Sequence, residues 1–222
     1  MRLARGAAAV ALAALATTGC HTKPVDYQSV WTTSSSPTST EAPVPISSYL
    51  ESVGVTGQPV IPEKLTDLTV TLPRPKGWEQ YDNPNLAPGT RVLAKGDTYP
   101  TAMLMAFKLN GDFDVAEAIK HGDADAKLSQ NFKTLNASDA NWRGFPSSMI
   151  EGSYDLNGRR MQSYNRIVFA TGTPPPAPAG QPAPPGQRYL IQLTVTGYAE
   201  KAAEEGPDIE SIIGGFDVTQ KK

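Results

Sequence analysis

The sequence predicts an α+β domain, built on a mostly antiparallel sheet of about seven strands with helices on both faces. Two observations predict this class. The pair Asn157-Gly158 separates two runs of alternating residues and is typical of the type I′ turn that joins antiparallel strands. The segment 101–110, TAMLMAFKLN, is apolar at odd and at even positions, so both sides of this strand need cover. We expect helices from elsewhere in the chain to provide it.

The start of the chain is typical of an exported protein. Arg2 and Arg5 precede an uncharged, alanine-rich run that is too short to span a bilayer, which predicts a signal peptide at 1–19. The single cysteine, Cys20, follows in a stretch that resembles a bacterial lipobox, where the cysteine receives lipid and becomes the first mature residue. The alternative is an ordinary signal peptide cut near Ala16, which would leave a free thiol. We expect lipid attachment at Cys20.

Two low-complexity segments divide the rest of the chain. Residues 20–43 are rich in Ser, Thr and Pro, which bury too little apolar area to offset the entropy of ordering, so we expect a disordered linker. Residues 44–219 are then expected to form a single globular domain. Within it, 172–187 has seven prolines in sixteen residues and interrupts two strand-like runs, which predicts a long surface loop.

The domain begins with short strands. The apolar residues of 68–72 alternate with threonines, which predicts a half-buried strand that ends at Pro73. Trp78 and Tyr81 are expected at the start of the next element. The segment 90–97 predicts another short strand, which leads into the doubly apolar strand described above.

The segment after that strand predicts a helical region. Asp114 and Glu117 have the spacing of a capping box, which marks the start of a helix. Gly122 is expected to break or bend the helix. Leu128 and Phe132 would then continue its apolar stripe.

The turn at Asn157-Gly158 also sets the register of its two strands. One face of the resulting hairpin is apolar, and the other carries charged and tyrosine side chains. The register predicts these cross-strand pairs: Leu156–Arg159, Asp155–Arg160, Tyr154–Met161 and Glu151–Tyr164.

Two further elements complete the domain. The segment 188–199 alternates with four inward apolar positions, which predicts a strand: Tyr189, Ile191, Leu193 and Val195. The segment 207–218 predicts a helix that docks on the sheet, with Pro207 near its first turn. Its apolar stripe follows the helical period: Ile209, Ile212, Ile213 and Phe216.

Composition and motifs argue against several function classes. Lys and Arg number 20 against 22 Asp and Glu, so no basic excess predicts nucleic-acid binding. His121 is the only histidine outside the linker and no nucleophile-elbow motif is present, so Ser147 and Ser148 are poor nucleophile candidates. Asp123 and Asp125 would share a metal with His121 only across a helix that a glycine interrupts. We expect no catalytic residues, no metal and no cofactor.

Two groups of side chains are candidates for ligand binding. Tyr164 and Arg166 lie on the charged face of the hairpin and would suit a polar headgroup, whereas cross-strand ion pairs on a solvated face are the simpler interpretation. The second group would line an apolar pocket, because methionine adapts to irregular ligands, although a cluster of methionine and aromatic residues more often forms an ordinary core. Its members are Trp78, Met103, Met105 and Phe107.

Several segments of the domain carry a family resemblance. They are PISSYLESVGVTG, LTDLTVTLPRPKGW, LAKGDTYPTAMLMAFKLNGDFDVAEAIKHGDADAKLS, GFPSSMIEGSYDLNGRR, NRIVF, RYLIQLTVT and DIESIIGGF. Together they resemble the LpqN-type mycobacterial lipoproteins over residues 44–217. The resemblance implies a lipid-anchored envelope protein with a domain similar to the Mog1/PsbP α/β/α sandwich, a fold that mostly serves non-enzymatic accessory or binding modules. Cys20 is the one functional residue that the resemblance carries over.

These observations predict a non-catalytic lipoprotein on the outer face of the cell membrane. It would bind an envelope lipid or glycolipid, or dock on proteins of envelope biogenesis. The alternative is a protein–protein adaptor, with an exposed apolar patch and no ligand cavity. A hydrolase is the least favoured class, because it would need His121 as its base.

Overall fold

The computed structural model describes residues 42–177 and 179–222. Its helices are α1 (Ile46–Ser52), α2 (Val115–Ile119), α3 (Ala124–Lys127) and α4 (Ala202–Gly215), with 3₁₀ turns at Pro62–Lys64 and Ala199–Lys201. Its strands are β1 (Thr56–Val60), β2 (Leu68–Thr71), β3 (Glu79–Gln80), β4 (Arg91–Ala94), β5 (Thr101–Asn110), β6 (Lys133–Ser138), β7 (Ser147–Leu156), β8 (Arg159–Thr171), β9 (Arg188–Tyr198) and β10 (Asp217–Gln220).

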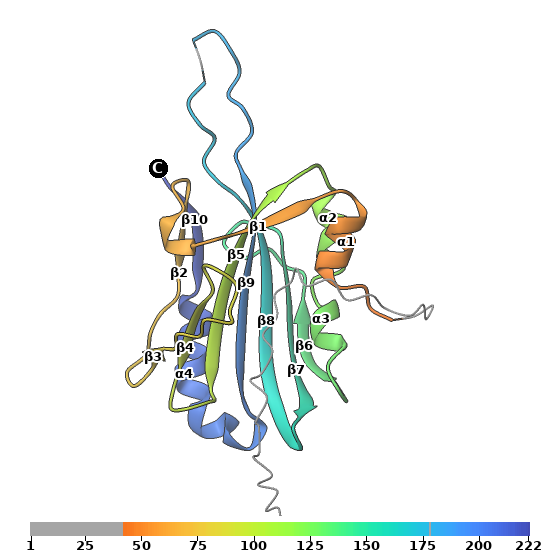
Figure 1. Cartoon of the computed structure of the whole chain (residues 1–222), viewed down its shortest axis with the longest axis vertical. Coiled ribbons are helices and arrows are strands. Elements are labelled where there is room, and N and C mark those ends of the chain that lie inside the picture. The colour runs from red at the N-terminus through yellow and green to blue at the C-terminus, as the bar shows by residue number, and fades with distance from the viewer. Residues whose placement is uncertain (1–41, 178) are drawn as a thin grey trace, which may run out of the picture.

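The described strands form one large antiparallel sheet and one small ribbon. The eight-stranded sheet has the order β3-β4-β5-β9-β8-β7-β6, with β1 also paired to β5. The ribbon consists of β2 and β10. In Figure 1 the long strands run side by side, with α4 on one side of the sheet and α1, α2 and α3 on the other. The predicted α+β class, with helices on both faces of an antiparallel sheet, is confirmed.

The two faces of β5 belong to two different core layers, as its doubly apolar sequence predicted. Leu104 lies in the layer beneath α4, together with Ile212 and Phe216 of that helix and its C-terminal end. Met105 lies in the opposite layer, with Leu50 of α1. Burial of apolar area on both sides makes β5 and its neighbour β9 the centre of the domain.

The β7–β8 hairpin has the register that the turn predicted. Leu156 pairs with Arg159, and each of the other expected pairs is present. Asn157 and Gly158 have φ values of 50° and 75°, the left-handed backbone that a type I′ turn requires at both central positions. Because the side chains of a strand alternate with period two, this register decides which residues reach each core layer.

The helical region after β5 agrees with its prediction in part. Asp114 caps α2, and its carboxylate accepts hydrogen bonds from the backbone N–H groups of Ala116 (2.8 Å) and Glu117 (3.2 Å). Glu117 does not complete a capping box, because its carboxylate accepts from Lys120 Nζ instead. The interruption expected at Gly122 separates α2 from α3. The predicted continuation of the apolar stripe is wrong at Leu128, because α3 ends before this residue and Leu128 is 50% exposed.

Helix α4 is longer than predicted. It begins at Ala202, so Pro207 lies inside the helix and not near its first turn. The 3₁₀ turn at Ala199–Lys201 leads directly into the two alanines that open the helix, and alanine has the highest helix propensity. The predicted docking stripe is confirmed, since Ile212 and Phe216 are fully buried against the sheet.

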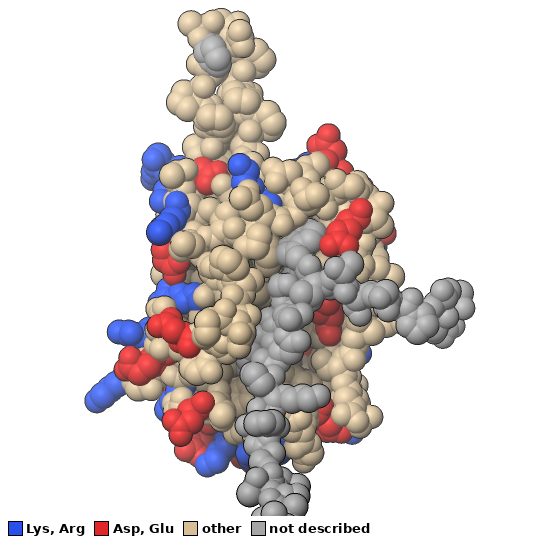
Figure 2. Space-filling view, in the orientation of Figure 1, with Lys and Arg blue, Asp and Glu red and all other residues tan. Residues whose placement is uncertain are grey.

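The proline-rich segment 172–187 connects β8 to β9. Figure 1 shows it extending well away from the body of the domain, and Figure 2 shows no acidic or basic side chain on the projecting part. Its two ends lie together, because Gly172 N donates a hydrogen bond to Gln187 O (2.8 Å). The remaining described surface in Figure 2 mixes acidic and basic side chains.

Candidate functional site

The lipid attachment predicted at Cys20 lies outside the described residues. The same holds for the signal peptide at 1–19 and for most of the linker. Within residues 42–177 and 179–222, no helix is both long enough and apolar enough to cross a membrane.

Trp78 is separated from the other apolar candidates by the sheet. It is buried in the layer beneath α4, where its indole Nε1 donates to Asp208 Oδ2 (3.1 Å). Lys95 Nζ donates to the same oxygen (2.6 Å). These two hydrogen bonds, that from Lys95 being the stronger influence, lower the pKa of Asp208. Trp78 therefore links α4 to the sheet through its hydrogen bond to Asp208. It lies in a different core layer from the methionines.

The structure brings Met103, Met105 and Phe107 together on the other face. They are successive members of one face of β5 and lie in the layer beneath α1 and α2, where all three are buried. Each has a direct partner on β9: Thr194, Gln192 and Leu190, respectively. Directly paired residues in a sheet share a face, so the partners' side chains extend this surface across the sheet.

Polar side chains continue that surface toward the other end of the strands. We call this set the polar rungs, and it consists of Gln192, Thr194 and Thr196 on β9 with Ser163 and Asn165 on β8. Thr194 pairs with both Met103 and Asn165, and Thr196 pairs with Ser163, so the members are neighbours. Each of them is neutral. The apolar end of the face thus passes into a row of hydroxyl and amide groups without a charge.

Hydrogen bonding within the polar rungs is incomplete. Asn165 Nδ2 donates to Ser163 Oγ (3.2 Å). Gln192 Oε1 is buried and has no hydrogen-bond partner among the described residues. A buried amide oxygen without a donor is costly, and it is the kind of group that a ligand hydroxyl satisfies.

Tyr164 and Arg166 lie on the face beneath α4, and the structure joins them directly. Arg166 Nε donates to Tyr164 Oη (2.6 Å), and Arg166 Nη1 donates to Ser147 Oγ (2.9 Å). The guanidinium carbon lies 4.2 Å from the centre of the Trp142 ring. We call Trp142, Ser147, Tyr164 and Arg166 the arginine–tryptophan cluster. Burial raises the pKa of Tyr164, so its hydroxyl stays protonated.

Sequence reasoning missed Trp142 as a member of this cluster. A tight turn brings it there: Arg143 and Gly144 both have positive φ, and Trp142 N donates to Phe145 O (2.8 Å). The Arg143-Gly144 pair between two aromatic residues is a weak hairpin signal compared with Asn-Gly. Ser147 was considered as a nucleophile, whereas its hydroxyl accepts from Arg166 and donates to Ala140 O (2.7 Å).

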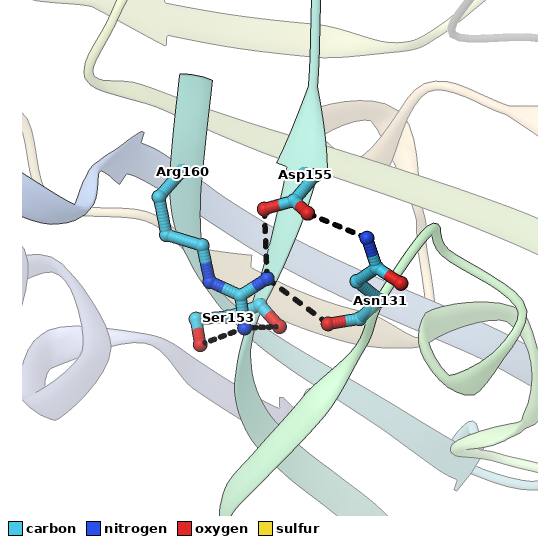
Figure 3. Close-up of polar contacts among 4 residues, drawn as sticks. All are labelled: Asn131, Ser153, Asp155 and Arg160. Carbon is cyan, nitrogen blue, oxygen red and sulfur yellow. Dashed lines mark hydrogen bonds and ion pairs between the residues drawn. The ribbon is translucent and has the colours of Figure 1, made fainter. Parts of the chain in front are cut away.

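The charged face of the hairpin only partly forms the predicted ion pairs. Asp155 and Arg160 do pair, at 2.9 Å, and Figure 3 shows that Arg160 also donates to Ser153 and to Asn131 O. Glu151 instead accepts from Gln162 Nε2 (2.9 Å). Arg166 forms no ion pair within the described residues and is only 7% exposed, so its expected place on a solvated face is wrong.

An open pocket of about 730 Å³ lies at the base of the proline-rich loop, away from all the predicted ligand residues. Asp67 stands in its wall and accepts from Tyr189 Oη at 3.0 and 3.1 Å. Burial, and then this contact with Asp67, raises the pKa of Tyr189 to about 12. Pro174, Arg188 and Lys221 are among the other lining residues, so the pocket is mixed in character.

His121 packs against α1 in the described structure. Its ring stacks on Tyr49 with centres 4.3 Å apart, and its Nδ1 lies 3.2 Å from Val44 O. No hydrogen bond among the described residues joins His121 to a serine or a carboxylate. The described residues also contain no group of three or more His, Cys, Asp or Glu side chains placed to hold a metal.

The fold and these surfaces define an antiparallel α+β sandwich with candidate binding surfaces on both faces of its sheet. The chain belongs to the LpqN lipoprotein family, because the family model described as "Probable lipoprotein LpqN" matches residues 42–219. The predicted family is thereby confirmed.

Named relatives agree with this family. The chain is 55% identical over 219 residues to the lipoprotein LpqT of Mycobacterium tuberculosis, covering 97% of this chain and 93% of that protein. It is 50% identical over 217 residues to LpqT of Mycobacterium leprae, covering 97% and 95%. The proline-rich 28 kDa antigen of Mycobacterium tuberculosis is 36% identical over 174 residues, which span 77% of this chain and 52% of the antigen. None of these three names states an enzymatic activity.

A solved structure shares the fold. A crystal structure of LpqN of Mycobacterium tuberculosis, described as involved in cell envelope biogenesis, matches with a TM-score of 0.62 at 19% identity, covering 81% of this chain and 98% of that one. A solution structure of cyanobacterial PsbP from Synechocystis matches with a TM-score of 0.43 at 11% identity, covering 71% and 95%. The LpqN likeness supports the fold alone.

Proposed function

We propose that this protein is a cell-envelope lipoprotein, held on the outer face of the cell membrane by lipid on Cys20. Membership of the LpqN lipoprotein family supports this, as does the signal-like start of the sequence that ends at Cys20. More than one acyl chain on a single residue holds a protein firmly, whereas one chain binds only marginally. The related LpqN is described as involved in cell envelope biogenesis, which supports an accessory role in the same compartment.

Replacement of Cys20 with alanine tests the anchor. We expect labelled palmitate to be incorporated into the wild-type protein and not into Cys20→Ala, and we expect the variant to leave the membrane fraction. Ser35→Ala, in the same linker, is the matched control and should behave as the wild type. A Cys20→Ala protein that remains equally membrane-associated would contradict the proposal.

The proposed ligand is an envelope lipid or glycolipid, bound by the domain without chemical change. The observation that carries this proposal is the continuous face on which Met103 and Met105 pass into the polar rungs. Methionine side chains suit an acyl chain, and uncharged hydroxyl and amide groups suit the hydroxyls of a sugar. The unpartnered Gln192 Oε1 supplies an acceptor beside Met105 for such a hydroxyl.

The two halves of this face would contribute differently to binding. Each buried methylene group contributes about 0.8 kcal/mol. A neutral hydrogen bond contributes about 0.5–1.5 kcal/mol net. We therefore expect the acyl chain to supply most of the affinity and the polar rungs to supply selectivity for a sugar headgroup.

Titration with model amphiphiles tests the ligand class. We expect dodecyl maltoside, used below its micelle concentration, to bind in isothermal titration calorimetry, dodecylphosphocholine to bind more weakly, and maltose alone not to bind. The variants Asn165→Leu and Thr194→Val together should weaken dodecyl maltoside about tenfold, the loss of roughly one good hydrogen bond. Thr69→Val, on the exposed side of β2, is the control. Equal binding by all these variants would remove the polar rungs from the site.

Native mass spectrometry of protein purified from its own membrane complements this titration. We expect a population that carries a bound lipid or glycolipid in addition to the covalent anchor. A clean apo mass in a gentle detergent would count against a ligand and in favour of an adaptor.

The adaptor alternative has one favourable feature. Among the described strands β6 is an edge of the sheet, and its residue Leu135 is 59% exposed at a bulge between Thr134 and Asn136. An unpaired strand edge is a site where a partner can add a strand. A photo-crosslinking amino acid at position 135 should then capture one reproducible envelope protein in intact cells. The control places the same photo-crosslinking amino acid at position 128, another exposed leucine, where we expect no such capture.

A further inference from the structure

Arg160 and Arg166 lie on the same face of the same strand and differ in their surroundings. Arg160 is half-buried and donates to Asp155, to Ser153 and to the Asn131 carbonyl (Figure 3). Arg166 is 7% exposed and has no carboxylate within 4 Å among the described residues. Arg166 is therefore the more buried of the two arginines and has the fewer hydrogen-bond partners. Because burying a charge is costly, the more buried arginine would be expected to have more partners.

This property is confined to Arg166. The described residues contain seven arginines, and six of them pair with an aspartate or glutamate: Arg74, Arg91, Arg143, Arg159, Arg160 and Arg188. Arg143 is the closest comparison, because its guanidinium lies over the same Trp142 ring, at 5.1 Å, and pairs with Asp217 at 3.1 Å. Among the described arginines, Arg166 alone is left without a carboxylate partner.

The contacts of Arg166 leave hydrogen-bonding capacity unused. A guanidinium has five N–H donors, and two of them are taken by Tyr164 Oη and Ser147 Oγ. Both acceptors are neutral hydroxyls. Stacking on Trp142 offsets part of the desolvation cost, as a cation–π contact does, but it satisfies no N–H group.

A second donor in the cluster also lacks an acceptor. Trp142 Nε1 is buried and has no hydrogen-bond partner among the described residues. The hydroxyl of Ser147 is already committed, since it accepts from Arg166 and donates to Ala140 O. The arginine–tryptophan cluster thus has a positive charge and free donors, and it lacks acceptors. This composition selects an anion over a neutral ligand or a cation.

We propose that the arginine–tryptophan cluster is an oxyanion-binding site, for a phosphate or carboxylate group. Two oxygens of such a group would meet the Arg166 fork, the geometry that arginine recognises best. Trp142 forms one wall, and the turn at Arg143-Gly144 holds it there. Arg166 pairs across the sheet with Leu193, in the layer beneath α4, so the site lies on the opposite face from the polar rungs. It therefore stands independently of the proposed glycolipid face.

The nearest charges do not already fill this role. Glu151 pairs across the hairpin with Tyr164, and its carboxylate accepts from Gln162. Asp217 is held in an ion pair by Arg143. Neither forms an ion pair with Arg166.

Binding can be tested on the full chain in phosphatidylcholine nanodiscs by following the Trp142 Nε1–H and Arg166 Nε–H resonances. We expect inorganic phosphate or acetate to shift both resonances saturably at constant ionic strength. In a second arm, phosphatidylglycerol replaces part of the phosphatidylcholine. Saturable shifts with the free anions would identify a soluble oxyanion, and shifts only with phosphatidylglycerol would identify a lipid headgroup. The absence of a saturable shift in both arms would overturn the proposal.

Three variants assign the effect to its residue. Arg166→Met should abolish the shift of the Trp142 resonance, and Arg143→Met, which removes the other guanidinium over the same ring, should retain it. Arg166→Lys keeps the charge without the fork, so we expect at least tenfold weaker binding. Arg166→Lys also keeps the site testable if Arg166→Met does not fold. Binding by Arg166→Lys that equals the wild type, or a shift retained in folded Arg166→Met, would refute the site.

Discussion

Asp155 and Arg160 close the β7–β8 hairpin near its turn, where Asn131 reaches them from the segment before β6 (Figure 3). Asn131 Nδ2 donates to Asp155 Oδ2 (2.7 Å), and Arg160 Nη1 donates to Asp155 Oδ1 (2.9 Å). These hydrogen bonds, first that from Asn131 and then that from Arg160, lower the pKa of Asp155. The folded protein therefore favours the charged carboxylate more than the unfolded chain does.

This pKa shift predicts a pH-dependent stability. A carboxyl group with a lowered pKa in the folded state stabilises above its ordinary pKa of about 4, and loses that contribution as the pH falls through the folded value. We expect Asp155→Asn to have a lower free energy of unfolding than the wild type at pH 7, with the difference closing toward pH 3. Urea unfolding at both pH values measures it.

The control for this experiment is Asp112→Asn, which removes another arginine pair, that with Arg188, from a fully exposed aspartate. An exposed pair of this kind contributes about 0–1 kcal/mol. A difference between Asp155→Asn and wild type that stays constant from pH 7 to pH 3 would contradict the role assigned to the carboxylate.

Single residues also show which side-chain contacts can be predicted from the sequence. The Asp155–Arg160 pair follows from the turn two residues away, so local geometry was enough to predict it. The surroundings of Arg166 come from Ser147, nineteen positions earlier in the chain, and from Trp142 in a separate turn. Whether an arginine meets a carboxylate or an indole depends on such distant segments, and strand periodicity carries no information about them.

At the scale of elements, the Asn157-Gly158 turn gives a direct test of backbone geometry. Gly158 has a φ of 75° and open space around the position of a Cβ atom, so an alanine there would be strained only through its backbone. We expect Gly158→Ala to lower the free energy of unfolding by about 1–2 kcal/mol, the cost of a left-handed alanine. Chemical denaturation measures this.

Gly214→Ala is the matched control. Gly214 lies within α4, also with open space around its Cβ position, and without a positive φ. The same substitution is expected to stabilise here by about 0.5–1 kcal/mol, because alanine forms helix better than glycine. Similar effects at the two positions would contradict the assignment of the cost to the turn.

The elements that the sequence did not predict are short or irregular. β1 contains Pro59 and lacks an alternating burial pattern, and β6 is exposed at nearly every position. α1 has only seven residues, and its burial depends on Ile46 and Leu50. Such segments are held by their neighbours, since a helix or strand of this length is marginal alone.

At the scale of the whole molecule, the proline-rich loop is separable from the core. Thr171 and Arg188 are the last paired residues of β8 and β9, so the strands already meet at the base of the loop. Deletion of residues 174–185 shortens the sixteen-residue loop to four. Two halvings of loop length reduce the entropy of closure by about 1.2 kcal/mol, so we expect an equal or slightly higher free energy of unfolding.

A thermal melt compares this deletion with a second variant, in which residues 174–185 are replaced by a Gly-Ser segment of equal length. The second variant tests composition without a change in length. A large loss of stability in the deletion alone would mean that the loop packs on the domain. Unchanged binding of dodecyl maltoside by the deletion would show that the ligand does not bind in the open pocket, because Pro174 and other loop residues line that pocket.

The candidate sites are also a whole-molecule property. The sequence predicted Trp78 together with Met103, and Tyr164 with Arg166, as groups that would face a ligand. The structure places Trp78 and Arg166 in one core layer and the methionines in the other. The roles of all these residues in ligand binding stay predictions. The polar rungs are neighbours only because β8 pairs with β9 in the folded sheet.

By itself, the sequence determined the class of the fold, the hairpin register, the double burial of β5 and the family, because each depends on local period, turn chemistry or a continuous run of residues. Only the tertiary structure decided that Arg166 is buried without a carboxylate, that Leu128 is exposed, and that Gln192 lies beside Met105. Those outcomes depend on which distant segments meet across the sheet. A local pattern specifies which face a side chain occupies, but not what it meets there.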